Sequence, residues 1–426
     1  MSARAQRQQA ELWLGRTPLE VGDLLFVRDG RREYSSFAYR PDWLSHRECF
    51  QVSPDLPLAA GRVTRRAPTA EDSPFPFALA DTEPDAWGRR IIDRAHARRR
   101  RDDPSLGPLT RFDYLTAVDD ESRIGALRLR DAKGEFLRNA REHRTPQLLD
   151  LSPIYASARR VEEGNENAQD LEYLQGKATS LGGLRPKCTV RDADGHLAIG
   201  KFPSIGDNRS ITRGEVLALK LASLVGIDAA EARIEVIDDV PIAVIRRFDR
   251  AADGGRLPYL SGGSLLQAQR HEDRAYSEIA DVLRAIGAEP TLDVQQLWRR
   301  ILFNLLITNT DDHLWNLGVL HVGQGQWRLA PAFDVNPFPD RARESKTWLS
   351  EDTGPITSLE MLLEYSEYFA LARTEAQAQA SAMATKLGQW RIVATSKEVG
   401  LTEKELAVFE PAFEHEAAAA ARALAG

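Results

Sequence analysis

Residues 309–316, with the sequence NTDDHLWN, are the stretch from which the fold is best predicted. They directly follow residues 295–308, which are apolar on more than one face and therefore predict a buried helix. The stretch contains the carboxylate of Asp311 and, five residues later, the amide of Asn316. A buried helix that ends here would deliver both oxygen-bearing side chains to a single loop.

The segments on either side of this loop are predicted from their hydrophobic periodicity. Lys201 lies on an alternating strand, and Glu215 lies on the helix that follows it. Gly226 is placed as the C-terminal stop of that helix, and Asp334 comes directly after a strand pair. The predicted elements are strands at residues 196–202, 232–237, 241–247, 317–321 and 327–330, and a helix at residues 214–225.

The N-terminal part predicts a smaller α+β unit. Residues 21–28 and 36–39 have a strand pattern, and a helix beginning at Trp87 ends in the arginine run at residues 98–101. A proline- and charge-rich zone at residues 144–153 marks a boundary. We therefore predict three regions. They are an N-terminal subdomain at residues 11–140, a nucleotide-binding region at residues 150–250, and a helical region with the catalytic and metal loops at residues 251–426.

Whole-chain properties limit the classes of function. The chain has 426 residues and a formal net charge of −7, which argues against nucleic-acid binding by this chain alone, since phosphate contacts need a basic face. Cys49 and Cys188 lie far apart in no ligand-like spacing, so a disulfide framework or zinc site is not expected. The beginning of the chain lacks the apolar core of a signal peptide, and no stretch predicts a membrane span. We expect a soluble, cytoplasmic protein without a membrane partner.

Phosphoryl transfer from ATP needs a backbone cradle and a lysine for the phosphates. The cradle is predicted at residues 180–183, with Ser180, Gly182 and Gly183 beside the nucleotide. Lys201 is the candidate phosphate-binding lysine. Glu215 on the next helix is predicted to pair with Lys201 and fix its position.

The same reaction needs a carboxylate for the incoming hydroxyl and oxygen ligands for Mg²⁺. Asp311 is the candidate catalytic base, and its offset from Asn316 is that of the aspartate and asparagine in the kinase catalytic loop. Asp334 stands where kinases place their principal Mg²⁺-binding aspartate. Carboxylate and amide oxygens are ligands that Mg²⁺ prefers, so Asn316 and Asp334 form the predicted metal site.

Each of these residues also has an ordinary structural interpretation. A strand lysine such as Lys201 is usually a solvated charge, and Glu215 is a common helix former. Asp311 is a residue type that favours helix N-caps, and Asp334 can simply close a turn. His313 either braces the loop through hydrogen bonds or contacts the nucleotide. The prediction of an active site depends on the joint order of the residues, not on any one of them.

The motifs resemble those of the HipA-like serine/threonine protein kinases, the toxins of type II toxin–antitoxin systems. The resemblance covers most of the chain, and five blocks in the family's order are hard to obtain by chance. The five blocks are residues 180–187 (SLGGLRPK), 201–204 (KFPS), 247–250 (RFDR), 309–313 (NTDDH) with Asn316, and 329–334 (LAPAFD). The N-terminal part adds matching pieces at residues 22–24 (GDL), 37–39 (FAY) and 85–89 (DAWGR).

The resemblance implies an α+β, two-lobed protein-kinase-like fold with an N-terminal α+β subdomain and a mostly helical C-terminal lobe. It also implies that ATP and Mg²⁺ are the cofactors. Adenine is expected near residues 246–248, so Arg247 and Phe248 become nucleotide-binding candidates. Arg246 stands where the family often has an acidic residue. Ser180 is the implied autophosphorylation site, with Thr179 as a substitute.

The resemblance further implies a small helix-turn-helix antitoxin of the HipB type as partner, with DNA contacted only through it. The implied substrate is a translation-related protein, such as an aminoacyl-tRNA synthetase. Three other functions remain open. They are a kinase of a small-molecule hydroxyl, a non-catalytic pseudokinase, and a metal-dependent phosphohydrolase. The hydrolase would use Asp311, Asp312, His313 and Asp334, but the chain lacks a second histidine–carboxylate cluster for a two-metal site.

Overall fold

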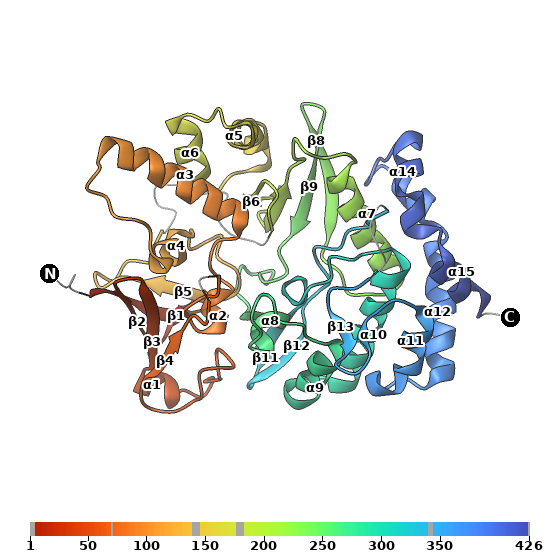
Figure 1. The fold of residues 1–426 in the computed structure, drawn as a ribbon, viewed down its shortest axis with the longest axis horizontal. Coiled ribbons are helices and arrows are strands. Elements are labelled where there is room, and N and C mark those ends of the chain that lie inside the picture. The colour runs from red at the N-terminus through yellow and green to blue at the C-terminus, as the bar shows by residue number, and fades with distance from the viewer. Residues whose placement is uncertain (1–4, 70, 139–144, 176–182, 340–343, 425–426) are drawn as a thin grey trace. The chain divides into compact units, whose positions relative to one another are not determined.

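The computed structural model describes residues 5–69, 71–138, 145–175, 183–339 and 344–424. The chain forms two compact units, each described by itself below. The N-terminal unit comprises Met1–Ile205, Asp249–Leu260 and Gly323–Gly325, and the C-terminal unit comprises Gly206–Phe248, Ser261–Val322 and Gln326–Gly426. Both contain helices and strands (Figure 1). Within the described ranges, no helix is long and apolar enough to cross a membrane.

The N-terminal unit is built on a five-stranded antiparallel sheet with the order β4-β3-β2-β1-β5. Alternate residues of its strands are buried, as in the run Ala10, Leu12 and Leu14. Phe26 lies at the centre of the core, with its ring 5.7 Å from that of Phe75 and 5.6 Å from that of Phe112. The strands are β1 (Gln6–Leu14), β2 (Leu19–Asp29), β3 (Arg32–Tyr39), β4 (Val63–Arg66) and β5 (Leu127–Arg130).

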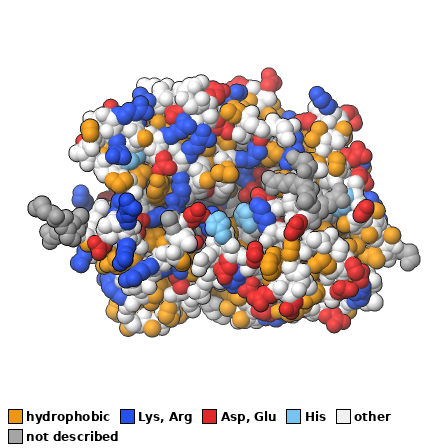
Figure 2. Space-filling view, viewed as in Figure 1, with side chains coloured by type: hydrophobic (Ala, Val, Ile, Leu, Met, Phe, Trp, Pro, Cys, Tyr) orange, Lys and Arg blue, Asp and Glu red, His pale blue; other side chains and the backbone are white. Residues whose placement is uncertain are grey.

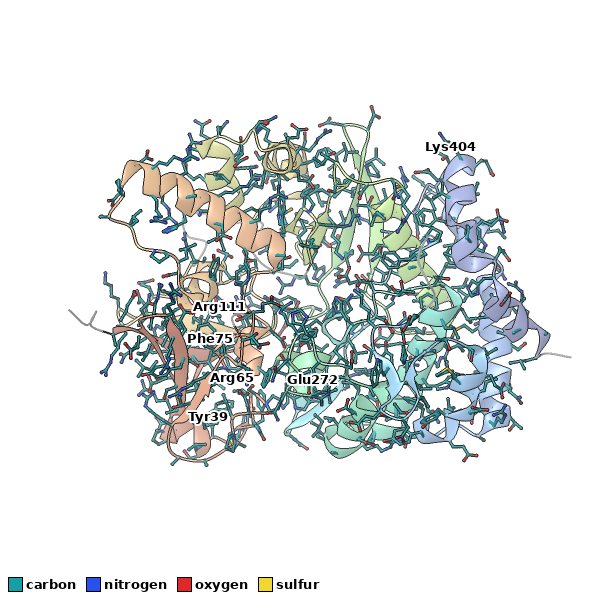
Figure 3. The ribbon with its side chains drawn as sticks, viewed as in Figure 1. Tyr39, Arg65, Phe75, Arg111, Glu272 and Lys404 are labelled. Carbon is teal, nitrogen blue, oxygen red and sulfur yellow. The ribbon has the colours of Figure 1, made fainter. Side chains whose placement is uncertain are left out.

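Loops of this unit are fixed by side chains that Figure 3 labels. Tyr39 donates its hydroxyl to the carbonyl of Leu56 at 3.1 Å. The guanidinium of Arg65 lies 3.6 Å from the ring centroid of Phe77. The helices of the unit are α1 (Pro41–Leu44), α2 (Phe77–Ala80), α3 (Ala86–Asp102), α4 (Arg111–Ala117), α5 (Leu151–Glu163) and α6 (Ala168–Gln175).

The strand predicted around Lys201 is present in the N-terminal unit. Strand β6 (Lys187–Arg191) pairs antiparallel with β7 (Leu197–Lys201). The turn between them is closed by Asp192, whose Oδ1 accepts from the backbone N of Asp194 at 3.1 Å and of His196 at 2.8 Å. These bonds explain why the aspartate- and glycine-containing sequence forms a turn here.

The C-terminal unit begins with α7 (Ile211–Leu224), which packs on the antiparallel pair β8 (Ala232–Ile237) and β9 (Val240–Arg246). Asp238 and Asp239 have φ values of +50° and +64°, as a tight hairpin turn requires. The helix stops at Gly226, as predicted, but begins before the predicted Gly214. A Cβ at Gly214 would lie 2.9 Å from the ring of Phe409, so this glycine permits close packing inside the helix.

Helix α10 (Pro290–Leu306) is the predicted buried helix before the NTDDHLWN stretch. It begins earlier than predicted because Pro290 occupies its first turn, where a missing N–H costs nothing. Trp298 is fully buried and donates Nε1 to the carbonyl of Leu362 at 3.1 Å. The other elements are β10 (Tyr259–Ser261), α8 (Gly262–Leu265), α9 (Tyr276–Ile286), β11 (Gly318–Gly323), β12 (Gln326–Leu329), β13 (Trp348–Ser350), β14 (Gly354–Pro355), α11 (Leu359–Glu364), α12 (Arg373–Leu387), α13 (Trp390–Thr395), α14 (Glu403–Phe413) and α15 (Glu416–Ala423).

Candidate active site

The loop after α10 is held at its start by polar contacts. Thr308 adopts a φ of +55° and donates its hydroxyl to the carbonyl of Ala412 at 3.0 Å. Asn309 donates Nδ2 to Asn304 Oδ1 at 3.0 Å, and its Oδ1 accepts from the backbone N of Asn336 at 3.4 Å. Asn309 therefore ties the loop to the segment that follows Asp334.

Asp311 and Asn316 are joined across the loop. Asn316 Nδ2 donates to the backbone carbonyl of Asp311 at 2.8 Å. The short 3₁₀ turn at Leu314–Asn316 has His313 at its N-cap, so Asp311 does not cap it. The Asp311 carboxylate is half-buried, and its Oδ1 accepts from the ammonium of Lys346. The carboxylate is thus fixed in place while part of it stays accessible.

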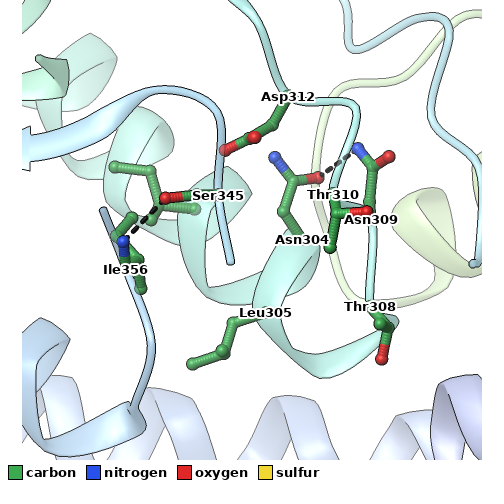
Figure 4. A pocket seen from close by; sticks show the side chains of 9 residues that line it. Asn304, Leu305, Thr308, Asn309, Thr310, Asp312, Ser345 and Ile356 are labelled. Atoms are coloured by element: carbon green, nitrogen blue, oxygen red, sulfur yellow. Dashed lines mark hydrogen bonds between the residues drawn. The ribbon is translucent and has the colours of Figure 1, made fainter. Parts of the chain in front are cut away.

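Asp312 anchors the segment that carries Lys346. Its buried carboxylate accepts from the backbone N of Lys346 at 2.6 Å and from the hydroxyl of Tyr276 at 2.9 Å. Thr347 donates its hydroxyl to the Asp312 carbonyl at 2.7 Å. Burial raises the pKa of Asp312 to about 6. Figure 4 shows this carboxylate beside Ser345 and Asn304, which line a small pocket with it. These contacts give Asp312 a structural role.

Asp334 lies in a second pocket with the predicted metal ligand Asn316. The pocket encloses about 480 Å³, counting the part open to solvent. Asp334 has a φ of +52°, a conformation that is uncommon outside glycine and that clusters at functional sites. The ring of Phe333 lies 5.2 Å from that of Phe248. The pocket is lined by Ile227, Tyr276, Arg300, Phe303, Asn304, Asn309, Asp312, His313, Asn316, Leu317, Ala332, Phe333, Asp334 and Val335.

His313 lies among the charges of this pocket. Burial lowers its pKa, Asp311 and Asp334 act to raise it, and Lys346 acts to lower it. Its Nδ1 is buried and has no hydrogen-bond partner within the described part of the chain. Within the described residues, Nδ1 of His313 therefore does not brace the loop through a hydrogen bond. Contact of His313 with the nucleotide stays a prediction.

The phosphate-binding candidates lie in the N-terminal unit. Lys187 at the start of β6 is directly opposite Lys201 at the end of β7, so both side chains are on the same face of the pair. Lys187 forms a 3.0 Å ion pair with Asp85, and both side chains are almost completely buried. Gly183 has a φ of +99°, and a Cβ there would lie 3.0 Å from Lys187 Nζ. Thr179, Ser180 and Gly182 lie outside the described residues.

The start of α3 is attached to the same place. Asp85 accepts from the backbone N of Gly88 at 2.7 Å and so caps the helix. Trp87 donates its backbone N to the Gly183 carbonyl at 3.3 Å. Asp85 and Lys187 were not predicted from the sequence as functional residues. The N-cap position of Asp85 was detectable, because an aspartate directly before a helix is a recognised signal.

The remaining candidates are divided between the two units. Lys201 is in the N-terminal unit and Glu215 is in the C-terminal unit. Both are buried, and their pairing stays a prediction. Arg247 is buried as well, whereas Arg246 is partly exposed and pairs with Glu231 at 3.0 Å. The predicted nucleotide contacts of Arg247 and Phe248 are likewise untested.

The second half of the RFDR block has a structural role that the sequence did not reveal. Asp249 Oδ2 accepts from the backbone N of Gly125 at 2.6 Å. Arg250 Nη2 donates to the carbonyls of Glu121 at 3.0 Å and Arg123 at 2.8 Å. These bonds attach residues 249–250 to the loop before β5.

The charges at the surface are mixed, as the composition suggests. The face in Figure 2 shows acidic and basic side chains interspersed with apolar ones. The whole chain has 56 Lys and Arg against 63 Asp and Glu. Among the described residues, no three His, Cys, Asp or Glu side chains form a metal-binding group.

Similarity to known proteins agrees with the fold. HipA in the Shewanella oneidensis MR-1 toxin–antitoxin complex of HipA, HipB and operator DNA superimposes with a TM-score of 0.66. The identity is 17%, and the match covers 97% of this chain and 96% of the other. The Helicobacter pylori proinflammatory kinase CtkA gives a TM-score of 0.44 at 13% identity, over 57% of this chain and 92% of its own, which adds nothing to the assignment. The predicted α+β fold of the HipA type is confirmed.

Similarity in sequence identifies the family. Y4mE of Sinorhizobium fredii, whose name assigns it provisionally as a kinase, is 25% identical over 319 residues. The match covers 70% of this chain and 71% of Y4mE. Residues 179–394, about half of the chain, match the family model of the HipA-like C-terminal domain. The predicted family is therefore confirmed, and the chain belongs to the HipA-like proteins.

Proposed function

We propose that this protein is a Mg²⁺- and ATP-dependent serine/threonine protein kinase. The observation that carries the proposal is the hydrogen bond from Asn316 Nδ2 to the Asp311 carbonyl, in a loop whose Asn316 shares a pocket with Asp334. A base and two metal ligands thus come from residues that are close in space. Membership in the HipA-like family supports the same activity.

The donor set fits Mg²⁺ and the phosphates of ATP. Because Asn316 uses its Nδ2 to donate to Asp311, its Oδ1 is the end left for a cation. Asp334 supplies a carboxylate in the same pocket, and hard oxygens are what Mg²⁺ prefers. Lys201, at the end of β7, is the lysine proposed for the polyanionic phosphate chain.

The residues divide the reaction between them. Bound Mg²⁺ would neutralise charge on the β- and γ-phosphates. Asp311 orients the acceptor hydroxyl and takes its proton. Lys201 holds the outer phosphates, and the predicted pair with Glu215 fixes its ammonium. Ser180 is the proposed site of autophosphorylation.

We also propose a role as the toxin of a toxin–antitoxin pair. HipA of Shewanella oneidensis, which shares the fold, was solved together with HipB and operator DNA. By that likeness the partner is a HipB-like helix-turn-helix antitoxin, and DNA is contacted through it. An aminoacyl-tRNA synthetase, or another translation protein, is the proposed substrate. The proposed location is the cytoplasm, which the two widely spaced cysteines suit.

The test is incubation with Mg²⁺ and γ-labelled ATP, alone and with host lysate, followed by phosphoamino-acid analysis. We expect labelled phosphoserine in the chain itself and a labelled protein in the lysate, and neither with Asp311→Asn. Release of free phosphate without any phosphoprotein would support the phosphohydrolase instead. Label found only in small molecules would support a small-molecule kinase.

A further inference from the structure

The backbone of Lys346 is held beside the loop that carries Asp311. Its backbone N donates to Asp312 Oδ1 at 2.6 Å. The next two residues are also held, because Thr347 Oγ1 donates to the Asp312 carbonyl at 2.7 Å and Trp348 N donates to the Arg274 carbonyl at 2.9 Å. Residues 346 and 347 are therefore attached to Asp312, and Trp348 to Arg274, independently of the Lys346 side chain.

The side chain of Lys346 extends from this point to the proposed base. Its ammonium donates to Asp311 Oδ1. The Lys346 side chain is 49% exposed and that of Asp311 is 35% exposed. An ion pair this open to water adds little to stability. Its position at the one carboxylate assigned as base suggests a role in the reaction.

The charge of Lys346 also acts on His313, which lines the same pocket as the proposed metal ligands Asn316 and Asp334. His313 experiences the charges of Lys346, Asp311 and Asp334 together, in addition to the burial that lowers its pKa. A positive charge paired with the proposed base is placed where negative charge develops during phosphoryl transfer.

We propose that Lys346 is a catalytic residue that contacts the transferred phosphoryl group from the acceptor side, an inference that rests on the proposed kinase function. The acceptor hydroxyl oxygen forms a bond to the γ-phosphorus, and its proton passes to Asp311. The bond from the γ-phosphorus to the bridging oxygen breaks, and ADP leaves with the electron pair. Lys346 stays protonated throughout and neutralises charge on the equatorial oxygens.

The experiment compares Lys346→Met and Lys346→Arg with Lys220→Met. Lys220 is a matched control, since it is a partly exposed lysine of the same unit that pairs with Glu398. Two quantities are measured for each protein. One is the steady-state rate of phosphate transfer, and the other is the affinity for Mg²⁺–ADP with and without aluminium fluoride, which imitates the transferred phosphoryl group.

Lys346→Met should lower kcat by about 100-fold, the usual effect of losing one electrostatic contact to a transition state, and leave KM for ATP nearly unchanged. It should weaken binding of Mg²⁺–ADP–aluminium fluoride by at least about tenfold without weakening Mg²⁺–ADP. Lys346→Arg should recover part of the kcat and part of the affinity for Mg²⁺–ADP–aluminium fluoride. Lys220→Met should match the wild type in both quantities.

The inference is overturned if Lys346→Met keeps the wild-type kcat, or if it binds the aluminium fluoride complex as tightly as the wild type. Equal weakening of Mg²⁺–ADP would show a merely structural role and would overturn it as well. These results leave the kinase proposal intact as long as the wild type transfers phosphate. A wild-type chain that neither binds Mg²⁺–ATP nor transfers phosphate would instead remove the proposed function itself.

Discussion

Two lysine–aspartate ion pairs, one in each compact unit, have the same chemistry and opposite surroundings. In the N-terminal unit, the Lys187 and Asp85 side chains are 2% and 4% exposed. In the C-terminal unit, the Lys346 and Asp311 side chains are 49% and 35% exposed. Breaking a buried pair leaves an uncompensated charge, whereas an exposed pair contributes little stability and stays accessible. We infer that the first pair maintains structure and the second serves the reaction.

The buried pair has a definite structural task. Asp85 uses one carboxylate oxygen to cap α3 and the other to bind Lys187 at the start of β6. The carbonyl of Gly183 is attached to the same helix start through Trp87. The pair therefore fixes the point at which the predicted nucleotide-covering loop enters β6.

The largest expected effect comes from breaking the buried pair. Asp85→Ala should lower the free energy of unfolding by about 3–5 kcal/mol, because it leaves the Lys187 ammonium buried without this partner. Asp311→Ala should change it by no more than about 1 kcal/mol, since its pair is exposed. Urea denaturation of the two variants measures the difference.

The double variant Asp85→Leu with Lys187→Met is the control for this comparison. Replacing both charges with apolar groups should recover much of the loss, because no charge then remains buried. Equal losses in Asp85→Ala and Asp311→Ala would contradict the division between a structural and a reactive pair.

A smaller effect is expected from Asp312, the buried carboxylate next to the exposed pair. Burial raises its pKa to about 6 from an ordinary value of 3.8, so the folded state binds this proton more tightly than the unfolded state. The stabilising contribution is complete below the ordinary pKa and is lost as the pH rises through about 6. The loss amounts to about 3 kcal/mol, given about 1.4 kcal/mol for each pKa unit.

Asp312→Asn removes this titration and keeps an oxygen that accepts from the backbone N of Lys346. The stability of the wild type relative to this variant should therefore fall between about pH 4 and about pH 6. Chemical denaturation at several pH values measures the difference. A difference that does not change with pH would show that Asp312 titrates in the folded protein as it does in water.

The smallest effect is expected in nucleotide binding. Lys201→Ala should weaken ATP binding by about tenfold, the lower range for a charge-assisted hydrogen bond, and should weaken ADP binding less. The reason is that the Lys201 ammonium is proposed to face the outer phosphates. Isothermal titration with ATP and with ADP measures the two losses of affinity. Equal weakening of ATP and ADP binding would point to a general folding defect.

Local pattern was enough to predict the elements that carry the site. Helix α10 and the loop after it follow from an apolar segment that ends at residues 309–316. Strand β7 and the β8–β9 hairpin follow from alternation and turn residues. In each of these elements the apolar pattern and the turn residues lie within one short stretch of sequence, so the element can be predicted from that stretch alone.

The contacts that complete the site could not be predicted, because they join residues far apart in the chain. Lys346 meets Asp311 over a separation of 35 residues, and Lys187 meets Asp85 over 102. No periodicity links such positions. The start of α7 was predicted at Gly214 instead of Ile211 for a similar reason. The glycine is placed inside the helix because it packs against the ring of Phe409, which is far away in the sequence.

The measurement that tests the central claim most directly is made on Asp311→Asn. Isothermal titration with Mg²⁺–ATP and a phosphate-transfer assay are performed on the same preparation. We predict nearly unchanged binding of Mg²⁺–ATP together with a loss of transfer of at least about 100-fold, because general-base contributions are of that size. A variant that still phosphorylates itself at the wild-type rate would contradict the assignment of Asp311 as the base.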